Sequence, residues 1–396
     1  MKNSLKNTLP IWIIFLFNAF LLAQQNYHDL HKKALVVDMH ADVLLNVLRG
    51  ANISRKLEFG HVDLPRLAEG GIDVQFFAVW PDPQKYKPDN MYKHSMYMID
   101  LLKEIIQKNP DKISLTVTPE EIEKTAAKNK IAACIGVEGG TVIENDLQKL
   151  QNLFDAGVRY LGLTWNDSPK WASSAKDESA PRFQGQKGLS VFGKKVIKKM
   201  NELGMIVDIS HSGEKTFWDV MEVSVKPVIA SHSCVYNICP HYRNLKDEQI
   251  KAIGKNGGVI FINFYPGYLQ KDFDEEYSRI RISAETVLDS LKISYGSDHL
   301  SFRRARNLYL DKLTEKMRPG LKKIVDHMDY IINLIGDDHV GIGSDFDGIS
   351  VTPQGIKDVS EMPELTRVML EKGYSEKRIR KIMGENFIRV FKEVTN

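Results

Sequence analysis

Short runs rich in Val, Ile and Phe recur along this chain between longer amphipathic stretches, which restricts it to a small set of α/β folds. We expect eight strands, at 34–42, 72–80, 131–138, 158–165, 205–211, 227–233, 257–264 and 339–346. Apolar residues at spacings of three and four predict helices between them, for example at 90–107, 191–204 and 321–336. Strands that alternate with helices in this way build a parallel sheet.

Eight such units in one polypeptide favour a single (β/α)8 TIM-like barrel over a doubly wound sheet. No G-x-G-x-x-G or Walker loop follows an expected strand, which argues against nucleotide binding. We expect one barrel domain over 27–396, with a helical tail at its C-terminus. The long, charged segment at about 266–320 follows the seventh strand and is expected to be an insertion with one helix, at 283–293. It is either a lid over the active-site face or a solvent-exposed surface insertion.

The charge balance argues against a nucleic acid partner. Lys plus Arg total 54 and Asp plus Glu total 51, and no basic block stands out. Three cysteines are too few for a disulfide scaffold or a Cys-based zinc site, so any metal must be bound by His and carboxylate groups. We expect Cys134 to be a buried thiol inside the barrel. Cys234 and Cys239 could form a disulfide in an oxidising compartment.

The first 23 residues have the three-part pattern of a secretory signal peptide. Lys2 and Lys6 precede the apolar run 9–23, and polar residues follow it. The run is 15 residues long, and a membrane-spanning helix needs about 20. We therefore expect residues 1–23 to be a signal peptide, the mature chain to have no stable membrane span, and the protein to be exported to the periplasm or secreted.

Polar residues that can bind a metal or transfer a proton stand where the expected strands end: His40, Asp42, Glu138, His211, His232 and Asp345. The C-terminal ends of barrel strands meet at one face, so these side chains are expected to converge. Because side chains alternate along a strand, His40 and Asp42 point to the same side and can share a metal ion.

Three His, one Asp and one Glu form a ligand set typical of zinc. A catalytic zinc ion usually has three protein ligands, so five ligands predict two ions with one bridging carboxylate, for which Glu138 is the natural candidate. A site with one ion and Glu138 as general base is the alternative.

Two further acidic residues, Asp38 and Asp63, are not expected to bind metal. Asp38 shares a face with His40 one layer below the strand end, and we expect it to orient a metal ligand; otherwise it is a hydrogen-bonded strand residue. The pair His61 and Asp63 resembles the first His-x-Asp motif but precedes Pro65 and an amphipathic stretch. Asp63 is therefore expected to cap a helix rather than to bind metal.

Motifs over most of the chain resemble the membrane (renal) dipeptidase family, zinc peptidases on a metal-dependent hydrolase barrel. They are VVDMHADVL, VDLPRLAEGGIDVQFFAVW, IGVEGG, RYLGLTWN, GLSVFGKKVIKKMNELGMIVDISH, PVIASHS, HYRNL, INFYPGY, HVGIGSDFDGI and the tail from DVSEMPEL onward. The resemblance implies that His40 and Asp42 bind one zinc ion, that Glu138 bridges, and that His211 and His232 bind the second.

The same resemblance assigns residues to the substrate. Asp345 corresponds to the acid/base aspartate and Arg243 to the arginine that binds the substrate carboxylate, while Tyr265 matches a tyrosine near the substrate. Trp165 departs from the family, because mammalian members have a substrate-contacting His there. An indole can donate one hydrogen bond but cannot accept a proton, so this contact and the substrate range are expected to differ.

The expected reaction is hydrolysis of a dipeptide with a free carboxylate by a hydroxide that bridges two zinc ions. A related amidohydrolase that acts on N-acyl amino acids or β-lactams is the first alternative, and a noncatalytic binding protein is the second. Related enzymes are often dimers, which leaves a homodimer open.

Overall fold

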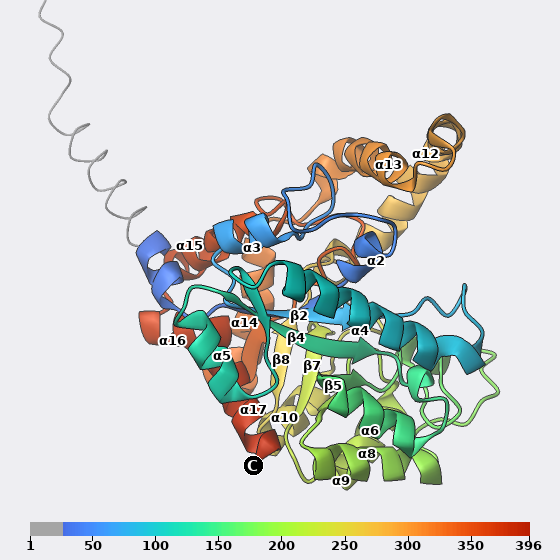
Figure 1. Cartoon of the computed structure of the whole chain (residues 1–396), viewed down its shortest axis with the longest axis vertical. Coiled ribbons are helices and arrows are strands. Elements are labelled where there is room, and N and C mark those ends of the chain that lie inside the picture. Colours follow the sequence, from blue (N-terminus) through green and yellow to red (C-terminus); the bar gives the residue numbers. More distant parts are fainter. Residues whose placement is uncertain (1–26) are drawn as a thin grey trace, which may run out of the picture.

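The computed structural model describes residues 27–396, and its centre is a nearly closed barrel of parallel strands (Figure 1). The eight barrel strands are β1 (Val37–Ala41), β2 (Val74–Val79), β4 (Ile131–Glu138), β5 (Val158–Gly162), β6 (Ile206–Asp208), β7 (Val228–Ser233), β8 (Val259–Ile262) and β9 (Val340–Ile342). They pair in this order, and an isolated bridge between Ala41 and Phe346 joins the first strand to the segment that follows the last one. The predicted TIM-like α/β fold is confirmed.

One strand was not predicted. β3 (Ile113–Leu115) pairs with the start of β4, with Ile113 opposite Ile131, while β5 pairs with the end of β4. A run of three residues is too short to show a periodicity in the sequence, and β3 is defined by its pairing with β4.

Helices surround the barrel. They are α2 (Leu44–Val47), α3 (Leu64–Glu69), α4 (Met91–Lys108), α5 (Pro119–Ala126), α6 (Leu147–Asp155), α7 (Ala175–Ser179), α8 (Val191–Leu203), α9 (Glu214–Val223), α10 (Asp247–Asn256), α14 (Lys322–Ile335), α15 (Pro363–Glu371), α16 (Glu376–Arg380) and α17 (Asn386–Thr395). The predicted helices at 90–107, 191–204 and 321–336 correspond to α4, α8 and α14. Asp63 caps α3 as predicted, because its side chain accepts a hydrogen bond from the Arg66 amide at 2.9 Å.

One of these helices, α17, packs its side chains against the barrel interior at the N-terminal end of the strands. Phe387 and Phe391 of this helix join a buried cluster with strand residues that include Phe76, Cys134 and Tyr160. The rings of Phe76 and Phe387 meet edge to face, with centroids 5.2 Å apart. The helical tail is therefore part of the barrel core, and Cys134 is buried as predicted.

The insertion after β8 is a helical hairpin. The short α11 (Pro266–Leu269) leads into α12 (Phe273–Tyr295) and α13 (His299–Thr314), which project away from the barrel (Figure 1). The prediction of a single helix at 283–293 was wrong: that segment lies inside the longer α12, and α13 was missed. Both helices expose apolar side chains, such as Ile282 and Leu308, so their apolar residues do not form the single clear stripe by which a sequence reveals a helix.

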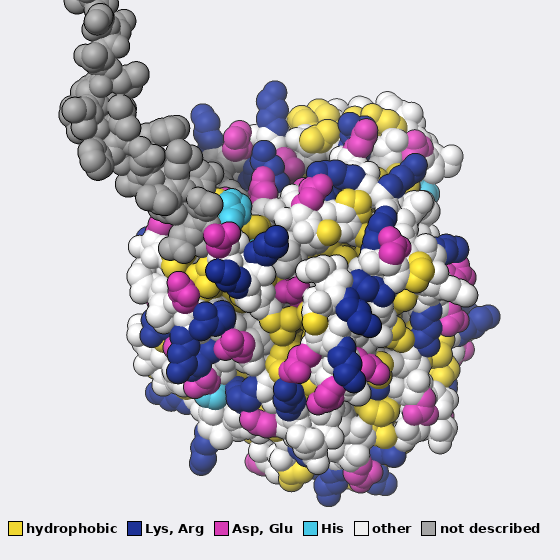
Figure 2. Space-filling view, turned by 60° about the vertical axis from the view of Figure 1, so that its left-hand side comes forward, with side chains coloured by type: hydrophobic (Ala, Val, Ile, Leu, Met, Phe, Trp, Pro, Cys, Tyr) yellow, Lys and Arg dark blue, Asp and Glu magenta, His cyan; other side chains and the backbone are white. Residues whose placement is uncertain are grey.

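The expected signal peptide, residues 1–23, lies outside the described residues. Within 27–396 no helix is both long and apolar enough to cross a membrane. Cys234 and Cys239 are free buried thiols, so no disulfide joins them. On the face in Figure 2, basic and acidic side chains are interspersed, in keeping with the charge balance of the sequence.

Candidate metal centre and active site

Five side chains from the C-terminal ends of β1, β4 and β7 and from the turn after β6 meet in a buried cluster, and Glu138 is at its middle. Glu138 Oε1 lies 2.9 Å from Nε2 of His211 and 3.6 Å from Nε2 of His232. Glu138 Oε2 lies 3.7 Å from Nε2 of His40, which is 3.4 Å from Oδ2 of Asp42. The two carboxylate oxygens of Glu138 thus face two different groups of side chains.

Each of the three imidazoles is held through Nδ1. The partners are the Tyr160 hydroxyl for His40 at 2.8 Å, Oδ1 of Asn166 for His211 at 3.1 Å, and the Ser231 hydroxyl for His232 at 2.8 Å. Since an amide oxygen only accepts, Nδ1 of His211 carries the proton and its Nε2 offers a lone pair. The Ser231 hydroxyl donates to Asp208 at 2.7 Å, so it accepts from His232 in the same way.

These tautomers leave an electron-rich centre. The Nε2 atoms of His211 and His232 lie 3.0 Å apart, so their lone pairs face each other unless a cation or a proton lies between them. Nε2 of His40 and Oδ1 of Asp42 are buried without a hydrogen-bond partner in residues 27–396. Buried polar atoms without a partner are costly. Bound metal ions would satisfy all of these atoms, and the side chains therefore fit a metal site.

Two triads of potential ligands are close enough to hold a cation: His40 with Glu138 and His232, and His40 with Asp42 and Asp345. In each triad the ligand atoms lie within 4.8 Å of one another. Imidazole and carboxylate are the donors that zinc accepts in hydrolases. Cys134, Cys234 and Cys239 lie outside both triads, as the low cysteine count led us to expect.

The imidazoles and carboxylates of the cluster shift one another's pKa values. Burial lowers the pKa of His211 and His232 well below the usual value for histidine, which keeps both rings neutral as metal ligands must be. Burial raises the pKa of Glu138 well above its ordinary range. Burial also opposes a charge on His40, but the Glu138 and Asp42 carboxylates outweigh it and raise the pKa of His40 to about 10. A bound cation would reverse this trend and keep the carboxylates ionised.

Asp345 follows β9 at the rim of the cluster and is partly buried. Burial raises its pKa to about 7, and the neighbouring Asp42 carboxylate adds to the shift. Its Oδ2 accepts a hydrogen bond of 2.9 Å from the side-chain amide of Asn263. A carboxyl group with a pKa near neutrality can take up and release protons at physiological pH.

The backbone is strained at this site. His211, Asp345 and Asp347 have φ angles of 63°, 60° and 66°, in the left-handed region that residues other than glycine rarely adopt. The Asp347 carboxylate holds its turn in place by accepting hydrogen bonds from the amides of His61, at 2.9 Å, and Val62, at 3.2 Å. The second His-x-Asp motif therefore supports the turn that carries Asp345.

Asp38 lies beneath the cluster and is fully buried. It accepts hydrogen bonds from the amide and the hydroxyl of Ser344, at 2.8 and 2.7 Å, and from the Gln75 side chain at 3.1 Å. Asp38 thus fixes the residue before Asp345, and its carboxylate also accepts a hydrogen bond of 3.5 Å from the backbone amide of His40. The sequence placed Asp38 below the site but did not identify Ser344 as its partner.

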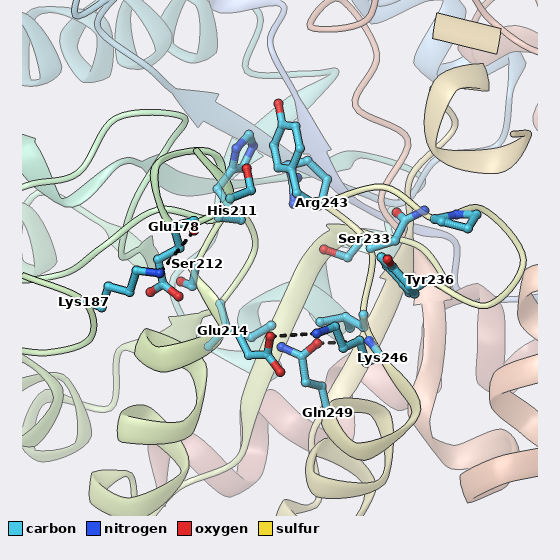
Figure 3. A pocket seen from close by; sticks show the side chains of 17 residues that line it. Glu178, Lys187, His211, Ser212, Glu214, Ser233, Tyr236, Arg243, Lys246 and Gln249 are labelled. Carbon is cyan, nitrogen blue, oxygen red and sulfur yellow. Dashed lines mark hydrogen bonds and ion pairs between the residues drawn. The ribbon is translucent and has the colours of Figure 1, made fainter. Parts of the chain in front are cut away.

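Arg243 lies on the other side of the cluster, in the loop after β7. The side chain is buried, Nη2 donates to the carbonyl of His232 at 3.1 Å, and the guanidinium lies 5.4 Å from the Tyr268 ring centroid. Its Nε has no partner in the described residues. Figure 3 shows Arg243 and His211 at the same side of a cavity of about 390 Å³.

The aromatic residues predicted near the substrate have different surroundings. Trp165 lines a cavity of about 170 Å³ over the metal cluster, and its ring centroid lies 4.7 Å from that of Trp80. The Tyr265 hydroxyl donates to Asp274 of the insertion at 2.7 Å, and Tyr268 lines the cavity instead. Tyr268 was missed, although it lies three residues further along in the same motif.

The sequence did not identify the three residues that hold the imidazoles through Nδ1. For one of them, Tyr160, the strand register could have indicated its position. Tyr160 pairs with Gly136 in the sheet, two positions below the pair of Gly162 and Glu138, so it faces the barrel interior under the metal cluster. Asn166 and Ser231 are adjacent in sequence to Trp165 and His232, and no periodicity distinguishes them from other polar loop or strand-end residues.

Comparison with known proteins places the whole described chain in one family. A model of the membrane dipeptidase family, peptidase family M19, matches residues 24–396. An uncharacterized dipeptidase of Schizosaccharomyces pombe is 31% identical over 390 residues, which cover 94% of this chain and 83% of that protein. The dipeptidase tcpJ of Claviceps purpurea is 33% identical over 342 residues, or 85% of this chain and 69% of that protein.

Solved structures agree with this placement. The probable dipeptidase PvdM from Pseudomonas aeruginosa superposes with a TM-score of 0.78 at 26% identity, over 94% of this chain and 98% of that one. A metallopeptidase from Rhodobacter sphaeroides, solved with a phosphinate mimic of the dipeptide L-Ala-D-Ala, gives a TM-score of 0.72 at 26% identity, over 91% and 99%. This chain belongs to the membrane dipeptidase family, peptidase family M19, and is a metal-dependent hydrolase of peptide bonds.

Proposed function

We propose that this enzyme hydrolyses dipeptides with two zinc ions per chain. His40 and Asp42 would hold one ion, His211 and His232 the other, and Glu138 would bridge them. The observation that carries the proposal is the position of Glu138, whose Oε1 faces His211 and His232 while its Oε2 faces His40. A single ion with Glu138 as base would leave one of these groups of side chains without a cation.

Zinc at this site, when bound, would lower the pKa of a water to near neutrality and polarise the peptide carbonyl. Asp345 would accept a proton from the attacking water at its carboxylate and return it to the leaving amine. Burial favours the protonated form of this carboxyl group, which supports proton uptake at Asp345. The Asn263 amide, 2.9 Å away, holds the carboxylate in position and leaves its other oxygen available.

Arg243 supplies the contact that would select a short substrate. Its guanidinium is buried beside His232 and lies over the Tyr268 ring, and Nε is without a partner in the described chain. A guanidinium can bind a carboxylate through two parallel hydrogen bonds. A substrate carboxylate held here would place the preceding peptide bond over the metal ligands, which fits a dipeptide with a free C-terminus.

Trp165 forms one wall of this site with Trp80. It offers a flat apolar surface and one N–H donor in place of an imidazole, so we propose that it contributes packing and orientation rather than proton transfer.

The decisive test combines metal content with turnover. Zinc-loaded protein should contain two zinc ions per chain and hydrolyse L,L or L,D dipeptides, and a chelator should abolish turnover. Asp345→Asn should keep both ions and lose about a hundredfold or more in kcat. Asp111→Asn, at an exposed residue before β3, is the control and should leave kcat unchanged.

Several results would contradict the proposal. One zinc ion per chain in a fully active enzyme would exclude the binuclear mechanism. Full turnover by Asp345→Asn would exclude the acid/base assignment. Efficient hydrolysis of N-acyl amino acids or β-lactams without hydrolysis of dipeptides would replace the proposed substrate class.

We also propose that the protein is exported, on the signal-peptide pattern of residues 1–23. The full-length protein, expressed in a bacterial host, should appear in the periplasm or medium with its first residues removed, as read by fractionation and intact-mass analysis. Full-length protein confined to the cytoplasm would contradict export.

A further inference from the structure

Another cavity adjoins the small cavity over the metal ligands and has no lining residue in common with the cavity that contains Arg243. The cavity that contains Arg243 shares His211 with the small cavity over the metal ligands. That small cavity shares Leu45 and Trp80 with a third cavity, of about 370 Å³. The three cavities therefore form a series with the metal ligands in the middle. A dipeptide whose carboxylate is bound by Arg243 would direct its amino-terminal residue toward the third cavity.

We call this third cavity the amino-side pocket. It lies between α2, the loop after β2 and the start of α4, and Leu45, Leu48, Trp80, Tyr86 and Tyr97 form its apolar and aromatic surfaces. Its volume exceeds that of the small cavity, so it can accommodate a long side chain. The aromatic rings can pack against the methylene groups of such a side chain.

Cations outnumber acids around the amino-side pocket. Arg49, Lys85 and Lys93 line it together with a single carboxylate, that of Asp82. None of the three cations forms an ion pair with a carboxylate in residues 27–396, whereas arginines such as Arg66 and Arg378 do. The Asp82 carboxylate accepts a hydrogen bond from the Gln84 amide at 2.9 Å within its own turn.

The helical insertion adds further positive charge next to this pocket. Nη2 of Arg303 in α13 donates to the carbonyl of Asp347 at 3.0 Å, and its Nε is buried without a partner in the described chain. Burial and then the Arg303 guanidinium lower the pKa of Arg49. Burial lowers the pKa of Arg306 to about 10, with Arg303 adding to the shift. Guanidinium groups that destabilise one another's charge favour binding of an anion.

We propose that the amino-side pocket selects dipeptides whose amino-terminal residue has an acidic side chain, Asp or Glu; this inference rests on the dipeptidase function proposed above. The side-chain carboxylate would bind among Arg49, Lys85 and Lys93, and its methylene groups would pack on Trp80 and Tyr86. The same cations would repel an amino-terminal Lys or Arg.

The test uses the full zinc-loaded chain and the substrates Glu-Ala, Gln-Ala and Lys-Ala at pH 7. Glu and Gln have nearly the same shape, so the ratio of kcat/KM for Glu-Ala to kcat/KM for Gln-Ala isolates the effect of the side-chain charge. We expect kcat/KM for Glu-Ala to exceed that for Gln-Ala by about tenfold and Lys-Ala to be the poorest substrate. The ratio of Glu-Ala to Gln-Ala should also decrease at high ionic strength.

Variants connect this preference to the pocket. Lys85 and Lys93 are exposed, so the double variant Lys85→Gln/Lys93→Gln should fold normally and reduce the Glu-Ala to Gln-Ala ratio severalfold. Arg49→Gln should reduce it further. Lys112→Gln is the matched control, because Lys112 is exposed just before β3, at the opposite end of the barrel. It should keep the wild-type ratio.

Equal kcat/KM for Glu-Ala and Gln-Ala, with efficient hydrolysis of both, would overturn this inference and leave the dipeptidase proposal intact. A Glu preference that survives in the double variant and in Arg49→Gln would also overturn it. If none of the three dipeptides is hydrolysed in either its L,L or its L,D form, the proposed function fails, and calorimetry then tests the pocket alone. Tighter binding of Glu-Ala than of Gln-Ala by about tenfold would support the inference, and equal binding would overturn it.

Discussion

The hydroxyl of Tyr160 lies 2.8 Å from Nδ1 of His40, on the side of the imidazole opposite the Nε2 atom that faces Glu138. The same hydroxyl donates to the carbonyl of Met39 at 3.3 Å, so it accepts the proton of His40 Nδ1. Tyr160 therefore fixes both the tautomer and the direction of a proposed metal ligand from inside the barrel.

Removal of this hydroxyl should weaken metal binding. Tyr160→Phe keeps the ring but leaves Nδ1 of His40 without its acceptor, and we expect metal affinity to decrease by about 10- to 100-fold. Competition with a chromophoric chelator measures it. Tyr330→Phe is the control, since that hydroxyl donates to Asp247 on the outer helices, 3.0 Å away. Unchanged affinity in Tyr160→Phe would show that His40 is oriented without Tyr160.

Gly136 provides the space that Tyr160 occupies. A Cβ at position 136 would overlap the Tyr160 ring, so Gly136→Ala should lower the free energy of unfolding by about 3 kcal/mol. Tyr160→Ala should cost about 3–5 kcal/mol because it leaves a cavity. The double variant should be more stable than the sum of the two effects predicts, by about 1 kcal/mol or more, in urea unfolding. Strict additivity would mean that the overlap is relieved elsewhere.

Arg243 should discriminate substrates by their C-terminus. Arg243→Lys keeps the charge but loses the planar pair of donors, and we expect KM for dipeptides to increase by about tenfold or more, with a smaller change in kcat. A dipeptide amide should be a poor substrate for both proteins, with little difference between them. An equal loss for the dipeptide and its amide would contradict a role in carboxylate binding.

Stability should decrease below pH 6.5 through His31. This buried side chain lies 2.8 Å from both the Thr366 hydroxyl and the Gly70 carbonyl, and burial lowers its pKa to about 4. Between about pH 6.5 and 4 the unfolded chain therefore binds one more proton at this residue than the folded chain. The stability that neutral His31 contributes is complete above pH 6.5 and is lost as the pH falls through this interval.

We expect this residue to account for about 2 kcal/mol of the stability lost between pH 7 and pH 4.5. The measurement compares urea unfolding of the wild type and His31→Gln at both pH values. The loss should be smaller in the variant by that amount. His299→Gln, at an exposed histidine of α13, should behave like the wild type.

The sequence was most informative about the barrel and the ends of its strands. Parallel strands must deliver their last residues to one face, so residues such as His40 and Glu138 could be placed together before any distance was known. The partners at Nδ1 could not be predicted, because Tyr160 and Asn166 reach the imidazoles from other strands and loops across the barrel. The hairpin α12–α13 was largely missed because it buries little apolar surface, and periodicity reveals a helix mainly through burial.

The position of α17 at the base of the barrel also has a consequence for the metal cluster at the opposite end. Phe387 and Phe391 share one buried cluster with residues such as Val37 and Phe76, which come from the first strands of the described chain. These aromatic rings fill the base of the same strands that carry the proposed metal ligands at their other ends. Loss of the two rings would leave a cavity beneath the metal cluster and loosen the strands that bring its ligands together.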